Sequence, residues 1–348
     1  MKKKSLSAKK TIHKKIIDFL KDPKIKKIYT DFSSIIKKKY NISSFSVAVS
    51  GGPDSLALSF ISKCFSELEN RKVFYNHVNH NLRPESSLEA SKIKKLLKKL
   101  DINCKILNWK GKKPKNNIQA KARKKRYELI IKENLKNKIK YIFTAHHQED
   151  NYENFILRLM RGSGLKGLTS FNQIESEFQP GTIVLRPFMS LKKKDLIYIS
   201  SKVFKYYVKD PTNYDQYYKR SRVRKIILNF KKEGFDFKKF DLTLNNLSSS
   251  NSTINFYVNK NIKENSKLSN DHKQYILSKK FFDKPDEIVF RSFSDILRKF
   301  SKKYYPKRGK SVTSIINKLS STKVKKLTLS GCIIEKLNNS VIIYKENH

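Results

Sequence analysis

Two consecutive glycines between an apolar run and a helical pattern form the part of this chain best suited to holding a phosphate group. The segment reads Ser50-Gly51-Gly52-Pro53-Asp54-Ser55 and follows the apolar run 45–49. Paired glycines adopt backbone conformations closed to other residues, so that successive N–H groups can converge on an anion. Ser50 and Ser55 add hydroxyl donors, and a helix beginning at Ser55 would point the positive end of its dipole at that anion. The spacing predicts a phosphate-binding loop.

Other kinds of loop fit this segment less well. No Gly-Lys-Ser/Thr follows, as a Walker loop requires, and no third glycine completes a dinucleotide fingerprint. An ordinary strand-to-helix turn would use the same Gly, Pro and Asp residues, but it would not require the flanking serines. Asp54 would repel phosphates in a low-dielectric site unless a divalent cation bridged them. We therefore expect Mg²⁺ at this loop.

The bulk composition points to a polyanionic partner. The chain has 348 residues, a formal net charge of +47 and a pI near 10.1, with 38% hydrophobic and 11% aromatic residues. This length allows two or three domains with a real core, and the aromatic content argues against a disordered basic tail. Nucleic acid is the natural partner of such a charge. Coding bias in an AT-rich genome would also enrich lysine, and both sources of the charge stay open.

Cysteine usage and hydropathy indicate a cytoplasmic protein. The three cysteines, Cys64, Cys104 and Cys332, are too far apart for a metal knuckle or a disulfide framework. No segment approaches the roughly 18 consecutive apolar residues that a membrane span requires. The basic first forty residues could be a transit peptide, although Asp18 and Asp22 count against it.

Strand and helix patterns alternate from about residue 44 to residue 210. Such alternation predicts an α/β fold in which a parallel sheet carries helices on both faces. Ligands of open α/β sheets bind at the carboxyl ends of the strands. The expected strands are 47–49, 73–78, 104–107, 141–145 and 181–185, and the expected helices are 55–69, 87–100, 118–134 and 150–161.

Polar residues follow two of these strands. The segment 79–83 follows the second strand, and the segment 146–154 follows the fourth. Asp150 and Glu153 stand three apart at the start of a predicted helix, hence on one face. Acidic residues in a first turn can simply cap a helix, but capping explains one acid and not a cluster with two histidines. Adjacent histidines point in different directions, which argues against zinc at His146 and His147.

The remainder of the chain is expected to form separate parts. We expect a basic helical extension over 1–42, the α/β domain over 43–224, a loosely helical connector over 225–280 and a small α+β domain over 281–348. That last domain would hold helices near 293–300 and 312–319 and a hairpin over 326–344 that turns at Asn338-Asn339. Lys307 and Arg308, beside two tyrosines, combine cations with stacking faces that suit RNA, although a solvated surface explains them equally.

Taken together, these motifs resemble those of the tRNA(Ile)-lysidine synthetases, a family within the PP-loop ATP pyrophosphatases. The loop 50–55 is similar to the Ser-Gly-Gly-X-Asp-Ser loop that holds the leaving pyrophosphate, and 146–154 is similar to the family's His-His-X-Asp-Asp-Gln-X-Glu-Thr. The resemblance is dense from about residue 45 to residue 224. Its further motifs lie at 78–83, 117–127, 157–168, 186–188, 210–213 and 220–224, and a weaker one lies at 327–335.

Several positions depart from the family pattern. Asn79 replaces an aspartate, Asn81 a glycine, Glu149 an aspartate, Asn151 a glutamine and Asn154 a threonine. The change at Asn79 places a metal or ribose role there in doubt, and Glu149 carries its carboxylate one methylene further out. The acids Asp54, Asp150 and Glu153 match the family pattern.

The resemblance implies a two-step ligation on the first anticodon cytidine of an isoleucine tRNA with a CAU anticodon. Cytosine O2 would attack the α-phosphorus of ATP and release pyrophosphate. The ε-amine of free lysine would then attack C2 and expel AMP. Positioning and charge neutralisation dominate such phosphoryl transfer.

The resemblance also implies roles for individual residues. Asp54 and Asp150 would hold the metal, and Asp150 and Glu153 would receive lysine. Arg123 or Arg126 would stabilise the α-phosphate. ATP contacts would come from the loop 50–55 with His80, His146, Arg161 and Gly162, and tRNA contacts from Arg220, Arg222, Arg224, Lys307 and Arg308.

Two other functions stay open at this stage. A related PP-loop enzyme could thiolate tRNA or form an amide, but thiolation calls for a cysteine near the loop and amide formation for a glutaminase domain. The chain could also be a basic RNA-binding module with a vestigial nucleotide loop. The oligomeric state is open as well, a dimer being one alternative.

Overall fold

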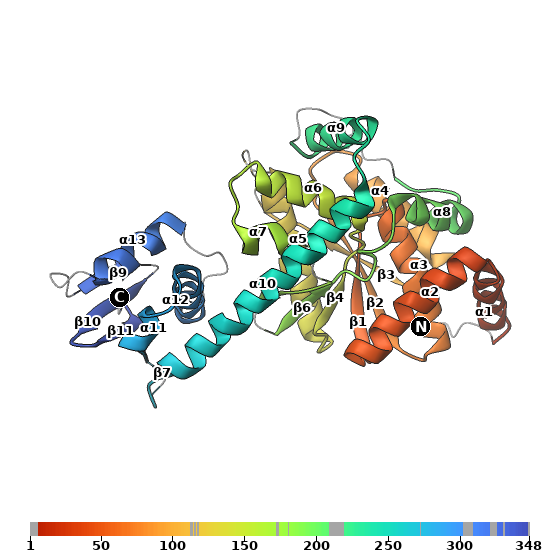
Figure 1. Cartoon of the computed structure of the whole chain (residues 1–348). Coiled ribbons are helices and arrows are strands. Elements are labelled where there is room, and N and C mark those ends of the chain that lie inside the picture. The colour runs from red at the N-terminus through yellow and green to blue at the C-terminus, as the bar shows by residue number, and fades with distance from the viewer. Residues whose placement is uncertain are drawn as a thin grey trace. The chain divides into compact units, whose positions relative to one another are not determined.

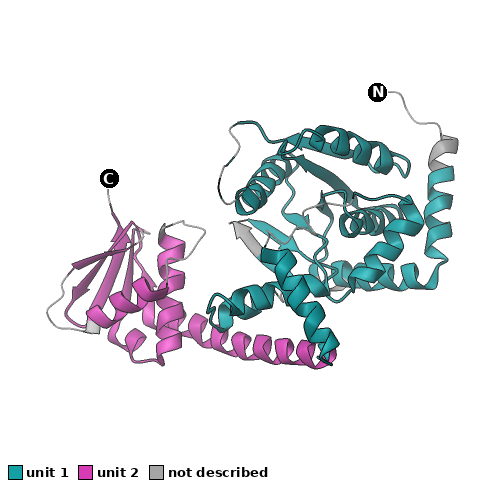
Figure 2. Cartoon of the chain, turned by 90° about the horizontal axis from the view of Figure 1, so that it is seen from above, with its two compact units in different colours: residues 1–237 teal, residues 238–348 magenta. Residues whose placement is uncertain are grey.

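The chain forms two compact units, residues 1–237 and residues 238–348, in the computed structural model (Figure 2). Each unit has its own hydrophobic core. The structure describes residues 6–111, 114, 116, 118–171, 174–179, 181–208, 219–271, 273–301, 309–320, 326–329 and 331–346.

A six-stranded sheet organises the first unit, in the order β3-β2-β1-β4-β6-β5 (Figure 1). Every neighbouring pair is parallel except β5 with β6, which is antiparallel. This confirms the expected α/β class. The strands are β1 (Ser44–Val49), β2 (Lys72–Asn79), β3 (Cys104–Asn108), β4 (Tyr141–Phe143), β5 (Glu175–Gln179) and β6 (Thr182–Leu185).

Alternation along β1 assigns its residues to the two faces of the sheet. Phe45, Val47 and Val49 enter the larger core, whereas Ala48 packs against the smaller core on α5. Ser46 is fully buried on the α5 side, where Asn134 donates a hydrogen bond of 2.8 Å to its hydroxyl. Helices therefore cover both faces, as the sequence predicts.

The helices of the first unit follow the expected chain order (Figure 1). Those that pack on the larger core include α3, α4 and α8, and α5 covers the other face. The helices are α1 (Leu6–Leu20), α2 (Pro23–Ser34), η1 (Ile35–Tyr40), α3 (Pro53–Leu68), α4 (Ser86–Lys98), α5 (Ile118–Lys136), α6 (Gln148–Leu159), α7 (Leu165–Thr169), α8 (Lys193–Phe204) and α9 (Lys219–Lys232).

The N-terminal helices are an integral part of this core. Ile16 of α1, Ile25 and Phe32 of α2 and Ile36 of η1 are all buried in it. Pro23 occupies the first turn of α2, and the Asp22 carboxylate caps the backbone N–H groups of Lys24 and Ile25. The basic extension thus folds against the α/β domain.

The second unit is an antiparallel sheet packed against helices, in the strand order β7-β8-β11-β10-β9. Buried side chains of α12 and α13 form its core with the strands. The turn expected at Asn338-Asn339 joins β10 to β11, where Leu337 pairs with Ser340. Its elements are α10 (Phe237–Asn265), β7 (Ser266–Leu268), β8 (Gln274–Ser278), α11 (Lys279–Phe282), α12 (Asp286–Ser301), α13 (Gly309–Ser320), β9 (Lys326–Leu329), β10 (Cys332–Leu337) and β11 (Ser340–Lys345).

Several details differ from the sequence expectations, and the helices α7 and α8 were not among the expected elements. Strand β5 was not expected. The segment 225–280 is not loosely helical, because α10 is one continuous helix of 29 residues. Strands β7 and β8 end that segment and belong to the sheet of the second unit.

Asparagine occupies several left-handed backbone positions. Asn41, Asn70, Asn81 and Asn338 have φ between 44° and 50°. Asparagine tolerates this region better than other side chains, because its amide can hydrogen-bond locally. Asn81 is the position where the family pattern has glycine, so the backbone explains both residue types.

Among the residues that the structure describes, no helix combines the length and the apolar content of a membrane span.

Replacing Phe32 by alanine should lower the free energy of unfolding by about 3–5 kcal/mol, the range for removing a buried phenylalanine. Phe32 is 1% exposed, and its ring lies 5.8–6.1 Å from the rings of Phe65, Phe143 and Phe188. Urea denaturation followed by circular dichroism measures the change. Lys27→Ala on the exposed side of the same helix is the control, and equal effects of both variants would contradict the packing role of α2.

Candidate active site

The site lies where the strand order of the sheet reverses. The connections from β1 lead to β2 and β3 on one side, and β4 pairs with the other edge of β1 through Ser46↔Ile142 and Val47↔Phe143. Crevices at such a switch point bind ligands in open α/β sheets. The glycine loop leaves β1 here, and the segment with His146 and His147 leaves β4 beside it.

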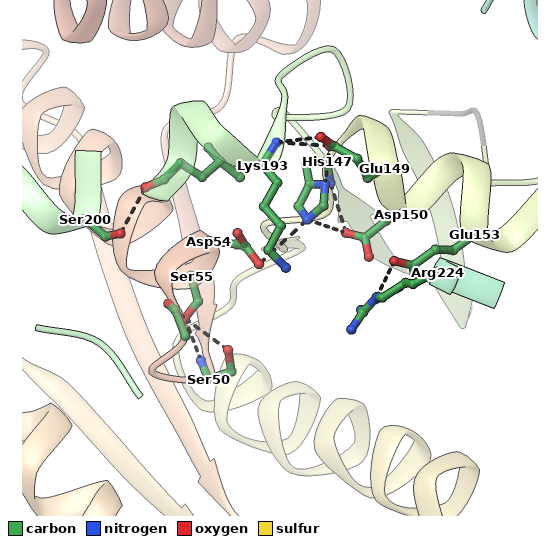
Figure 3. Close-up of polar contacts among 12 residues, drawn as sticks. Ser50, Asp54, Ser55, His147, Glu149, Asp150, Glu153, Lys193, Ser200 and Arg224 are labelled. Atoms are coloured by element: carbon green, nitrogen blue, oxygen red, sulfur yellow. Dashed lines mark hydrogen bonds and ion pairs between the residues drawn. The ribbon is translucent and has the colours of Figure 1, made fainter. Parts of the chain in front are cut away.

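Ser55 holds the glycine loop in shape (Figure 3). Its hydroxyl oxygen accepts hydrogen bonds from the backbone N–H groups of Ser50 and Gly51, at 3.1 and 3.0 Å, and donates to the Gly52 carbonyl at 3.1 Å. The Ser50 hydroxyl oxygen also lies 3.1 Å from the Ser55 hydroxyl oxygen. The expected hydroxyl donor is therefore engaged within the loop, and Ser55 acts on the loop's own backbone.

The two glycines differ in what they require. Gly51 has φ of 89°, and a Cβ there would lie 2.2 Å from Cδ1 of Ile93. Its carbonyl also accepts a hydrogen bond of 3.0 Å from the N–H of Val208. Gly52 has φ of −72°, and a Cβ there would meet nothing nearer than the Ser50 hydroxyl at 3.8 Å. Only Gly51 is thus required by the chain itself, and Gly52 leaves room for a ligand at the start of α3.

His147 joins three carboxylates (Figure 3). Its Nδ1 lies 3.0 Å from Glu149 Oε2, and its Nε2 lies 3.8 Å from Asp54 Oδ2 and 3.5 Å from Asp150 Oδ2. The backbone N–H of His147 also donates to Asp150 at 3.1 Å, which completes the cap of α6. The structure therefore brings together Asp54 from the first loop and Asp150 from the second.

The surroundings shift the pKa values of this cluster in different directions. Burial raises the pKa of Asp54, and the positive charges of His147 and Lys193 oppose that shift. Burial would also raise the pKa of Asp150, but the charge of His147 holds it below its ordinary value. Burial would lower the pKa of His147, yet the hydrogen bond to Glu149 and the aspartate charges raise it. The carboxylates thus stabilise a cation between them.

The carboxylates of Asp54 and Asp150 fit a magnesium ion that also binds phosphate oxygens. Asp54 Oδ1 is buried and has no hydrogen-bond partner. Within the described part of the chain, no group of three or more His, Cys, Asp or Glu side chains is arranged as a complete metal cage. Mg²⁺ in nucleotide enzymes takes one or two carboxylates plus phosphate oxygens and water. Asp54 and Asp150 match that donor set.

The other histidines face different neighbours. His146 Nδ1 lies 2.8 Å from the Thr144 hydroxyl, and its ring contacts the edge of Phe171. Burial lowers the pKa of His146 well below its ordinary value, so its imidazole is neutral. His80 lies after β2, with its ring 5.8 Å from that of Trp109.

Glu153 is buried and paired with an arginine. Arg224 of α9 donates from Nε at 2.6 Å and from Nη2 at 3.4 Å, and Arg220 lies 4.0 Å away. The Glu153 side chain is only 5% exposed. Glu153, which was expected to receive lysine, thus forms one cluster with Arg220 and Arg224, which were expected to contact tRNA.

Arg123 and Arg126 lie on α5. Burial lowers the pKa of Arg126, and the positive charges of Arg123 and Arg220 add to that shift. No acid in the described residues forms an ion pair with Arg126. Such a partly desolvated cluster of guanidinium groups suits an anion.

The remaining expected residues follow α6, lie on α9 or fall outside the described part of the chain. Arg161 and Gly162 follow the last turn of α6, which carries them about 16 Å along the chain's helical rise from Asp150. Arg222 is exposed on α9. Lys307, Arg308 and the segments 210–213 and 302–305 lie outside the described residues, as does Asn117.

Lys193 was missed by the sequence reasoning. It lies in the run Lys192-Lys193-Lys194, which resembles an ordinary solvated surface. Its backbone N–H donates to both oxygens of Glu149, at 3.2 and 3.0 Å, and its side chain extends toward Asp54 (Figure 3). The available signal was its place after strand β6, which neighbours β4 in the sheet.

Comparisons with known proteins place these features in a family. A model described as "PP-loop domain" matches residues 22–230. The tRNA(Ile)-lysidine synthase of Wolbachia sp. subsp. Brugia malayi (strain TRS) is 33% identical over 306 residues, covering 86% of this chain and 70% of that protein. The tRNA(Ile)-lysidine synthase of Wolbachia pipientis wMel is 30% identical over the same length, with the same coverage.

The fold also matches a solved structure. The U34-tRNA thiolase NcsA from Methanococcus maripaludis superposes with a TM-score of 0.55 and 16% sequence identity. The match covers 65% of this chain and 79% of that chain. At this identity the similarity establishes the fold alone.

Gly51→Ala and Gly52→Ala should separate the two glycine roles. Gly51→Ala should lower the free energy of unfolding by about 1–3 kcal/mol, because alanine is strained at this positive φ. Gly52→Ala should change stability by less than about 1 kcal/mol, yet weaken binding of ATP, because its Cβ enters the open space beside α3. Urea denaturation and calorimetric titration with ATP measure the two effects. Unchanged ATP affinity in Gly52→Ala would remove the ligand from this place.

Proposed function

Because this chain belongs to the tRNA(Ile)-lysidine synthase family, we propose that it uses ATP to join lysine to the first anticodon cytidine of an isoleucine tRNA with a CAU anticodon. One observation of the structure carries the proposal. The glycine loop after β1 and the carboxylates of Asp54 and Asp150 meet at the switch point of the sheet. A protein that acts on tRNA belongs in the cytoplasm, which is where we place it.

The first step activates the base. Cytosine O2 attacks the α-phosphorus of ATP, the bond from that phosphorus to the bridging oxygen breaks, and pyrophosphate departs with the electron pair. The open face at Gly52 and the start of α3 receive the pyrophosphate, since helix N-termini favour anions. Arg126, with Arg123 beside it, stabilises charge on the α-phosphate.

Asp54 and Asp150 would hold Mg²⁺ against the phosphates. The ion, when bound, neutralises charge that develops on the departing pyrophosphate. The orphaned Oδ1 of Asp54 supports this role, because a buried carboxylate oxygen without a partner is costly unless a cation approaches it.

The second step joins lysine to the activated base. The ε-amine attacks C2, and the C2–O bond to the adenylate breaks, so that AMP leaves. Asp150 and Glu153 are the acids that would orient the amine and take up its proton. The Glu153–Arg224 pair presents both signs of charge, which suits an amino acid with an ammonium and a carboxylate. The exposed Arg222, with Lys307 and Arg308, would meet tRNA phosphates.

A tRNA thiolase of similar fold is the main alternative. Such chemistry requires a reactive thiolate. Cys64, Cys104 and Cys332 are all buried, and burial raises the pKa of Cys104 to about 12 and that of Cys64 further. The thiols thus favour ligation over thiolation.

The direct test is incubation of the purified protein with labelled ATP, lysine and a CAU-anticodon tRNA. We expect AMP and lysidine to form only when lysine and tRNA are both present, with nucleoside analysis by mass spectrometry as the readout. RNA binding without ATP cleavage would favour a binding module and reject the proposal.

Asp54→Ala should abolish pyrophosphate release, with a loss of at least about 10²-fold in kcat as for other groups that stabilise developing charge. The affinity for tRNA should stay within twofold of the parent, because Asp54 lies at the phosphate loop. Pyrophosphate release assays and filter binding provide the measurements. Full turnover in this variant would remove Asp54 from the metal site.

Glu153→Gln should raise KM for lysine by about 10-fold or more, since a charged hydrogen bond contributes about 1.5–3 kcal/mol. KM for ATP should change little. Glutamine keeps the size of the side chain and an oxygen that can accept from Arg224. The exposed acid Glu128, changed to Gln, is the control, and a larger effect on ATP than on lysine would reassign Glu153.

A further inference from the structure

The start of α8 is fixed to the active site through its backbone. Glu149 accepts hydrogen bonds from the N–H of Lys193 at 3.2 and 3.0 Å and also contacts His147. Asp195 caps the same end, accepting from the N–H of Lys192 at 3.2 Å. Leu196 and other residues of α8 are fully buried in the core. The position of Lys193 is thus set by groups other than its own side chain.

The side chain of Lys193 enters the site. It is half-buried and extends toward Asp54, on the side of the cluster that faces the glycine loop (Figure 3). Its charge is one of the two that oppose the effect of burial on the pKa of Asp54. No acid within the described residues forms an ion pair with its ammonium, whereas Lys202 of the same helix pairs with Asp22.

We propose that Lys193 is a further catalytic residue, whose ammonium binds the departing pyrophosphate of ATP. This inference rests on the proposed function. When cytosine O2 bonds to the α-phosphorus, the bond to the bridging oxygen breaks and its electron pair stays on pyrophosphate. A cation near that oxygen stabilises the charge as it develops. The ammonium enters the step as a hydrogen-bond donor and keeps its protons.

Charge and position together assign Lys193 to the nucleotide rather than to the reacting amine of the lysine substrate. A lysine substrate carries an ammonium of its own, which a second ammonium repels. The Glu153–Arg224 pair lies on α6 and α9, whereas Lys193 extends to Asp54 at the start of α3. Lys193 therefore serves the departing pyrophosphate, whereas Arg126 serves the α-phosphate.

The test compares Lys193→Met, Lys193→Arg and the control Lys194→Met. Methionine keeps the length of the stem without the charge, and each variant retains the backbone N–H that Glu149 holds. Lys194 is the exposed neighbour on the same turn. Calorimetry with the α,β-methylene analogue of ATP and with inorganic pyrophosphate measures binding. Single-turnover release of pyrophosphate measures chemistry.

We expect Lys193→Met to slow pyrophosphate release by about 10²-fold and to weaken binding of inorganic pyrophosphate at least 10-fold, the size of one charge-assisted hydrogen bond. KM for lysine, tRNA affinity and the urea midpoint should match those of Lys194→Met. Lys193→Arg should recover most of the pyrophosphate affinity.

Two results would overturn the inference. One is equal pyrophosphate affinity and release in Lys193→Met and Lys194→Met. The other is a Lys193→Arg protein that binds pyrophosphate no better than Lys193→Met. Because the parent protein would still form lysidine in either case, the proposed function would stand. If the parent formed no lysidine, the pyrophosphate titrations would still decide the role of Lys193.

Discussion

The parallel pairing of β1 with β4 is the constraint on which the active site depends. Asp54 and Asp150 are far apart in the sequence, and only the adjacency of these strands brings their loops to one edge of the sheet. The register of β1 is in turn held by its packing, since a shift of one residue would move Phe45 and Val47 out of the larger core to the face that α5 covers. Core packing and catalytic geometry therefore share one set of strand contacts.

Charge is distributed unevenly in this strongly basic chain. At the switch point, His147 lies among three carboxylates, while Arg220 and Arg224 of α9 lie beside Glu153, and the charge of Arg220 also acts on Arg126 of α5. The acidic cluster is suited to a cation and the arginine cluster to an anion. Substrate groups of opposite charge would therefore be attracted to different parts of the site. A uniform basic surface could bind RNA, but it would not offer separate places for a cation and for an anion in this way.

Much of the fold could be predicted from the sequence, because apolar periodicity marks the five parallel strands and the helices α3, α4, α5 and α6. The glycine loop and the acids at 150 and 153 were visible for the same reason, as polar residues at predicted strand ends. Lys193 and the Glu153–Arg224 pair were not, because both depend on how helices distant in the sequence approach the site. Strand β5 was missed because its sequence, Glu-Ser-Glu-Phe-Gln, contains a single apolar residue.

The asparagines in left-handed turns affect how turns can be recognised in this sequence. Four of these turns, at Asn41, Asn70, Asn81 and Asn338, hold the residue type that ranks next to glycine in tolerating that conformation. Six glycines also have positive φ, so asparagine marks changes of direction in this polypeptide as well as glycine does. A search for turns that counts glycine alone would therefore overlook four left-handed positions in this chain.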